Sequence, residues 1–225
     1  MNYTLVAVSV LTAALPALAQ EVPKVDRVSQ MQQIAQSLGV QCAYCHSAPR
    51  GSGEAEPKKE IARAMMAMTD DINARLRAAT GKAPGQVTDI ECAYCHRGVP
   101  VPRPISDIVW QTTREKGVAA AIDQYRDLRQ HFFGRSTYDF GEDTLITVSN
   151  QMANARADDA IALMKLNLEF YPRSVRSYMA LAFAETRKLD DTAAMASLEK
   201  ALEIEPDNSP AKGRLEQLKS YHRQR

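Results

Sequence analysis

The chain contains the pentapeptide Cys-Ala-Tyr-Cys-His twice, at residues 42–46 and 92–96. All four cysteines of the protein lie in these two copies. The pattern is typical of c-type haem attachment, in which two thiols form thioethers with the porphyrin vinyl groups and the following histidine binds the iron. The sequence therefore predicts two covalently bound c-type haems. Their thioether residues are Cys42, Cys45, Cys92 and Cys95, and their proximal iron ligands are His46 and His96.

Three other uses of the cysteines compete with haem attachment. The two pairs are compatible with local disulfides in an oxidising compartment. They are also compatible with one four-thiolate zinc site, for which two C-x-x-C pairs are the usual form. A thioredoxin-like redox pair needs a βαβ pattern that this sequence lacks. None of the three explains why a histidine follows the second cysteine in both copies, so haem attachment is the preferred interpretation.

A helix is expected before the first pentapeptide, with Asp26 as its N-terminal cap and Gly39 in the left-handed position that ends it. Met31 lies on the apolar face of this helix, 15 residues before His46. A thioether on that face can supply the second axial bond to the iron. The alternative for Met31 is a packing role, because methionine commonly fills apolar gaps.

A second, longer helix is expected from Pro57 to about Thr80, with Gly81 as its stop. Met65 and Met68 are its candidate axial ligands, and spacing alone does not choose between them. Met66 is expected to point elsewhere, next to Arg63 and Asn73. The apolar stripe of this helix comprises Ile61, Met65, Met68, Ile72 and Leu76.

Three segments, residues 31–46, 62–73 and 92–102, resemble the cytochrome c subunit of photosynthetic reaction centres. That family binds four haems in two related pairs, and most of its irons take a methionine from the helix before each attachment site. The resemblance covers about residues 20–104, equivalent to one dihaem half. It implies Met31 as the distal ligand of the first iron and Met65, with Met68 as the alternative, as that of the second.

The C-terminal half contains a 34-residue repeat, since Tyr-Pro at residues 171–172 recurs as Glu-Pro at 205–206. The period resembles a tetratricopeptide repeat, which is a helix–turn–helix unit. We expect units at about 141–172 and 173–206, a capping helix at 207–222, and a divergent helix pair at 106–116 and 118–132. Such a stack has a groove that binds a protein or peptide. Bracing of the haem domain, or self-assembly, is an equally open role.

Composition indicates the fold class, and the N-terminus indicates the cellular location. Abundant alanine and sparse aromatic residues favour an all-α protein. The net charge of +1 gives no reason to expect nucleic acid or an anionic membrane as a partner. Residues 1–19 are typical of a secretory signal, which predicts a periplasmic protein with no integral membrane segment after cleavage. The expected domains are then 20–104, a dihaem cytochrome domain, and 105–225, a helical repeat domain.

The function predicted from these features is electron transfer between redox proteins. An iron with histidine and methionine on opposite sides has no open position for a substrate, so we expect a carrier and not an enzyme. Two alternatives stay open: a dihaem peroxidase-like oxidoreductase with one five-coordinate iron, and a repeat-based assembly protein with structural haems. His131, the one mid-chain histidine outside the pentapeptides, is expected to be packed or on the surface.

Overall fold

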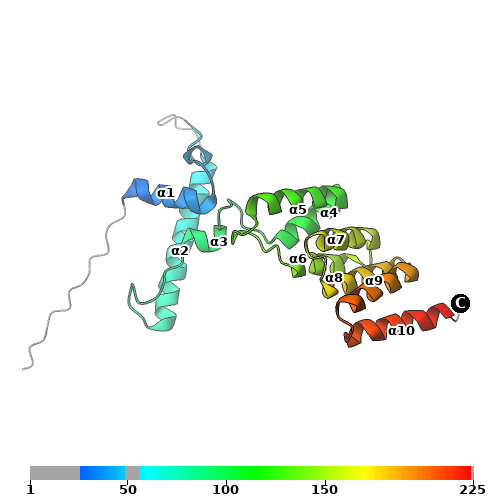
Figure 1. The fold of residues 1–225 in the computed structure, drawn as a ribbon. Helices are drawn as coiled ribbons and strands as arrows, with labels where there is room; N and C mark the ends of the chain where they lie inside the picture. The colour runs from blue at the N-terminus through cyan, green and yellow to red at the C-terminus, as the bar shows by residue number, and fades with distance from the viewer. Residues whose placement is uncertain (1–25, 49–55, 224–225) are drawn as a thin grey trace, which may run out of the picture.

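A computed structural model describes residues 26–48 and 56–223, and the fold of this part is entirely helical (Figure 1). This confirms the expected all-α class. The predicted signal segment at 1–19 lies outside the described residues. No helix in the described ranges is both long and apolar enough to span a bilayer.

In the ranges that the structure describes, the helices before Pro104 form an N-terminal module, and a helical array extends away from it (Figure 1). The helices of the N-terminal module are α1 (Arg27–Leu38), the 3₁₀ helix η1 (Cys42–Tyr44), α2 (Pro57–Thr80) and α3 (Cys92–His96). Those of the helical array are α4 (Ile105–Lys116), α5 (Val118–Phe132), α6 (Glu142–Met152), α7 (Ala157–Phe170), α8 (Val175–Arg187), α9 (Asp191–Ile204) and α10 (Ser209–Arg223).

Local sequence signals fix both ends of α1. The Asp26 carboxylate accepts hydrogen bonds from the backbone N–H groups of Val28, at 2.8 Å, and Ser29, at 3.1 Å. These bonds satisfy two amide donors that have no partner inside the helix. At the other end, Gly39 has a φ of 64°, in the left-handed region that glycine adopts without steric cost. The expected cap and stop of this helix are both confirmed.

The helix α2 has the expected bounds, but it presents a different face to the rest of the module. The face toward α1 and the second pentapeptide carries Met66, Thr69 and Asn73. The expected apolar stripe is exposed instead, with Ile61 at 60%, Met65 at 37% and Met68 at 47%. Met66 lies on this face beside Arg63 and Asn73 and away from the stripe, as expected. The buried amide of Asn73 orients the helix through its hydrogen bonds to the chain at Ile90.

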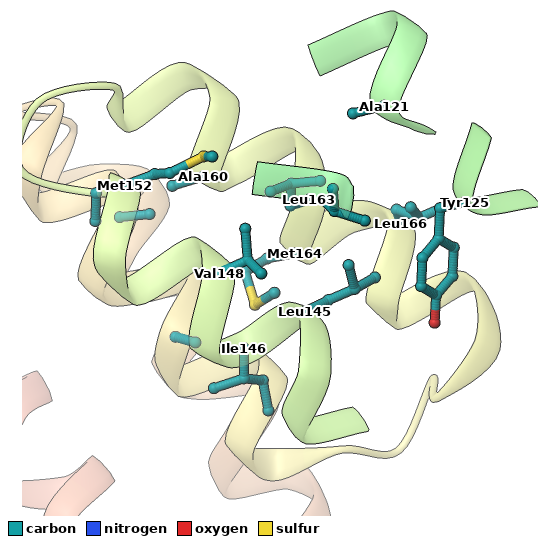
Figure 2. Close-up of a cluster of buried hydrophobic side chains, with 14 of the residues drawn as sticks. Ala121, Tyr125, Leu145, Ile146, Val148, Met152, Ala160, Leu163, Met164 and Leu166 are labelled. Atoms are coloured by element: carbon teal, nitrogen blue, oxygen red, sulfur yellow. The ribbon is translucent and has the colours of Figure 1, made fainter. Parts of the chain in front are cut away.

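The helical array is a stack in which consecutive helices pack together, apart from α5 and α6, and in which α4 packs on α6, α5 on α7 and α6 on α8. The pairs α6–α7 and α8–α9 correspond to the two expected repeat units, and α10 packs on α9 as the expected cap. The core of the array is apolar and closely packed (Figure 2). Its fully buried side chains include Tyr125, Leu145, Val148, Met152, Leu163, Met164 and Leu166.

Burial differs sharply between the two parts. Among the described residues of the N-terminal module, only Asn73 and Val99 are buried. No residue of α1 is buried, although this helix has an apolar face. A segment of this length that buries so little of its own apolar surface does not offset the entropy of ordering its backbone. The module therefore needs an additional apolar component to hold its shape.

The two pentapeptide segments are joined by a close backbone contact. The Gly98 N–H, directly after the second pentapeptide, donates to the Ser37 carbonyl near the end of α1, at 2.8 Å. A Cβ atom at Gly39 would lie 2.2 Å from the Gly98 carbonyl oxygen. Because a methyl group does not fit in that space, glycine at position 39 is required by the approach as well as by its φ.

We predict that Gly39→Ala destabilises the N-terminal module more than Gly81→Ala does. Both glycines have a φ of 64°, so both alanines incur about 1–2 kcal/mol of left-handed strain. A Cβ at Gly81 meets nothing within 4 Å, which makes this variant the matched control. Urea unfolding and hydrogen exchange of the Gly98 amide measure the difference. Equal losses in the two variants would show that the backbone contact does not matter.

Candidate haem-binding sites

The first pentapeptide opens into a cavity of about 430 Å³ between α1, η1 and α2. Cys42, Cys45 and His46 all line it, and so does Met31 from α1. The structure therefore brings together the two thiols, the imidazole and the thioether that the sequence placed at the first site. The remaining lining is mostly apolar and includes Ile34, Ala35, Leu38, Val40 and Ala62.

A smaller cavity of about 140 Å³ lies between the second pentapeptide and the first turns of α2. It is lined by Cys92 and His96 from α3 and by Met65 from α2. Met68 lines neither this cavity nor the first. Cys95 faces a separate hollow on the side of the helical array, so the second set is less completely gathered than the first.

The two cavities share a wall that is one layer of side chains thick. Five residues line both of them: Ile34, Leu38, Cys45, Ala62 and Met66. Met66 is half-buried at the centre of this set, because its side of α2 faces the rest of the module. Groups held in the two cavities are consequently adjacent, with apolar side chains and no broad layer of solvent between them.

The orientation of His96 is set by the backbone. Its Nδ1 lies 3.1 Å from the carbonyl oxygen of Val99. Since a carbonyl only accepts hydrogen bonds, Nδ1 carries the proton and Nε2 keeps its lone pair. This tautomer is the one that an iron-binding histidine needs, because Nε2 is then the ligand atom. The hydrogen bond from Nδ1 to the Val99 carbonyl also fixes the plane of the ring.

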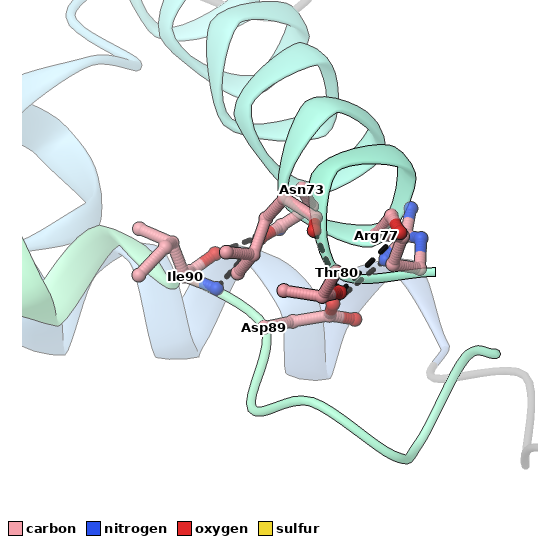
Figure 3. Close-up of polar contacts among 6 residues, drawn as sticks. Asn73, Arg77, Thr80, Asp89 and Ile90 are labelled. Carbon is pink, nitrogen blue, oxygen red and sulfur yellow. Dashed lines mark hydrogen bonds and ion pairs between the residues drawn. The ribbon is translucent and has the colours of Figure 1, made fainter. Parts of the chain in front are cut away.

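The loop before the second pentapeptide is held to α2 by two polar contacts (Figure 3). The Asn73 side chain donates to the Ile90 carbonyl at 3.0 Å and accepts from the Ile90 N–H at 2.7 Å. Arg77 pairs with Asp89 at 2.7 Å. Asn73 thus acts as a backbone substitute and fixes the start of α3 relative to Met65. This role of Asn73 was not predicted from the sequence, and its one signal there is a polar residue seven positions after Met66 on the same face of α2.

Charged residues are distributed unevenly around the two cavities. Arg27, Lys59 and Arg63 line the first cavity, whereas Lys58 is the charged residue that lines the second. The Lys59 ammonium hydrogen-bonds Glu56 and holds the pKa of that carboxyl below its ordinary value. The Lys58 ammonium lies 3.7 Å from the centre of the Tyr44 ring, in a cation–π contact.

This combination of groups fits a covalently attached haem at the first pentapeptide, and at the second it differs only in that Cys95 faces the neighbouring hollow. Two thiols, an imidazole with a free Nε2 and a thioether are the donors that a His/Met-ligated c-type haem uses. Apolar walls suit the porphyrin faces, and the cations suit its two carboxylates. The low burial of the module also fits, since a large apolar group would cover the surface that the polypeptide leaves open. His131, by contrast, is exposed on α5 and lines neither cavity, as expected.

Comparison with known proteins supports the resemblance seen in the sequence. Residues 42–152 match the family model described as the photosynthetic reaction centre cytochrome C subunit. Cytochrome c-554 of Chloroflexus aurantiacus is 32% identical over 69 residues, which cover 31% of this chain and 16% of that protein. The chain thus spans a small fraction of this relative. The predicted resemblance to this cytochrome family, whose haem is covalently bound, is confirmed.

The matched range does not coincide with the expected domain boundaries. It begins at Cys42 and therefore leaves out Met31. It runs past Pro104 through α4 and α5 to the end of α6. The boundary near Pro104 and the ligand role of Met31 stay predictions.

We predict that Asn73→Ala loosens the second site more than Arg77→Ala does. Alanine at 73 leaves two partly buried backbone groups of Ile90 without these partners, at a cost of up to about 3 kcal/mol. Loss of the partly exposed Arg77–Asp89 pair costs roughly 0–1 kcal/mol. Denaturant unfolding and exchange of the Ile90 amide provide the measurements. If the Ile90 amide stays protected in Asn73→Ala, the two hydrogen bonds between Asn73 and Ile90 are not what holds the loop.

Proposed function

We propose that this protein is an exported dihaem c-type cytochrome that carries electrons between redox proteins. In this proposal Cys42 and Cys45 bind one haem and Cys92 and Cys95 bind the other. The observation that carries it is the first cavity, where both thiols of a pentapeptide, its histidine and a methionine from another helix line one apolar space.

The proposed axial pairs are His46 with Met31 and His96 with Met65. Each histidine shares a cavity with its proposed methionine, which supports both pairs. Met65 is preferred to Met68 because Met65 lines the second cavity and Met68 does not. The Val99 carbonyl holds His96 in the tautomer that presents Nε2 to an iron.

A bound haem would supply the one-electron chemistry, and the residues of the chain would prevent substrates and water from reaching the iron. A methionine thioether opposite each histidine leaves no coordination position for a peroxide or another substrate. The apolar lining from Ile34, Leu38 and Ala62 excludes water, which favours the less charged, reduced state of the iron. The protein is therefore proposed as a carrier and not as an enzyme.

The shared wall supports direct electron transfer between the two haems. Leu38, Cys45 and Met66 belong to both linings, so a single layer of side chains separates the two cavities. The helical array is proposed to hold a redox partner or to assemble copies of the chain. Its tetratricopeptide character and the periplasmic location are part of the same proposal.

A haem count tests the function directly. We expect about two haems per chain by pyridine haemochrome assay and by mass spectrometry after expression in a host that matures c-type cytochromes. The variant Cys92→Ser with Cys95→Ser is expected to keep one, because its first cavity is unchanged. A colourless wild-type protein rules the proposal out. Carbon monoxide binding by the reduced, as-isolated protein instead favours a peroxidase-like enzyme with an open iron position.

The ligand assignment has its own test. Met31→His and Met65→His are each expected to lower the potential of one haem by more than about 59 mV, equal to a tenfold shift in a one-electron equilibrium. The reason is that a thioether raises the potential of a haem iron relative to a second imidazole. Met68→His is the matched control and should leave both potentials in place. If Met68→His lowers a reduction potential and Met65→His does not, Met68 and not Met65 is the ligand of the second iron.

A further inference from the structure

A segment of the helical array, residues 134–141 between α5 and α6, contacts the chain directly after the second pentapeptide. We call it the array loop. The Thr137 hydroxyl donates to the Arg97 carbonyl at 2.6 Å. The Arg97 guanidinium donates back to the Ser136 carbonyl at 3.3 Å and to the Tyr94 carbonyl within α3. Arg97 adopts a φ of 50°, which is uncommon for a residue with a side chain.

These bonds restrain a short element that has few contacts of its own. The helix α3 spans five residues, and it carries both cysteines and the histidine of the second site. Val99, whose carbonyl orients His96, lies two residues beyond the Arg97 carbonyl that Thr137 binds. A shift of the array loop therefore changes the position of the group that holds His96.

The array loop also faces the second pentapeptide across a hollow of about 460 Å³. Cys95 and His96 line it from α3, and Tyr138 and Asp139 line it from the array loop. The first cavity has no such neighbour, because all of its lining residues lie between Arg27 and Met66. The array loop is thus next to one of the two sites and remote from the other.

The array loop is itself fixed to the core of the helical array. The Tyr138 ring packs edge-on against Phe132 at a centroid distance of 5.2 Å and against Phe140 at 6.1 Å. Phe140 is buried, and its carbonyl accepts a hydrogen bond from the Arg129 guanidinium at 3.1 Å. Because the array loop is fixed to this core, its contacts with Arg97 hold α3 in a fixed position relative to the helical array.

We infer that the array loop forms one side of the second haem site and sets the reduction potential of that haem alone. The helical array is then part of the redox centre in addition to any docking role. The physical cause is partial exclusion of water from His96, which is half-buried, because a more polar surrounding stabilises the oxidised, more positively charged haem. This inference rests on the proposed function, since it requires a haem at the second pentapeptide.

The test is potentiometric titration of the full-length holoprotein with Thr137→Val. Valine keeps the shape of threonine and removes the donor to Arg97. We expect the potential of the second haem to fall, with a two- to tenfold change in its ratio of reduced to oxidised form at a fixed applied potential. That range equals about 18–59 mV for a one-electron couple. The first haem should not shift, and Thr137→Ser, which keeps the hydroxyl, should restore the wild-type value.

The matched control is Thr112→Val, which removes a 2.6 Å hydrogen bond to Gln124 between α4 and α5, away from the second pentapeptide. It should change neither potential. The first haem is assigned as the one missing from Cys42→Ser with Cys45→Ser. If Thr137→Val moves both potentials, or neither, while two haems remain attached, the inference is wrong and the proposed function stands. If the wild-type protein carries no haem at the second pentapeptide, the proposed function itself fails.

Discussion

The contact between the end of α1 and the backbone after the second pentapeptide is the constraint on which the N-terminal module depends. One amide hydrogen bond, from Gly98 to Ser37, and the absence of a side chain at Gly39 bring together two segments about 60 residues apart. This contact places the second pentapeptide beside the first cavity. Without this contact, nothing in the backbone would hold the two cavities side by side, and they would share no lining residues.

The two halves of the protein are stabilised in different ways. The helical array has a core of its own, built from side chains such as Leu145, Leu163 and Met164 that are fully buried. The N-terminal module is held instead by specific polar contacts, of which Asn73 with Ile90 and His96 with Val99 are the clearest. Such contacts define geometry but supply little free energy. A porphyrin in each cavity would provide the apolar mass that the polypeptide lacks.

Local signals were sufficient to predict most element boundaries and the composition of the first site. Asp26 and Gly39 act within a few residues of the helix that they delimit, so their roles can be predicted from the sequence. The orientation of α2 was not, because it depends on Asn73 reaching Ile90, 17 residues away. The role of Thr137 was equally hidden, since its partner Arg97 lies 40 residues earlier. Contacts across such separations follow from tertiary packing, which periodicity does not encode.

The uneven burial also bears on what happens to the chain before it matures. A newly made polypeptide has a helical array with its own apolar core, whereas its N-terminal part presents the unpacked stripe of Ile61, Met65 and Met68. Proteases and chaperones act on segments of that kind. The abundance of the protein would then follow the supply of porphyrin, because unloaded copies would be cleared from their N-terminal side.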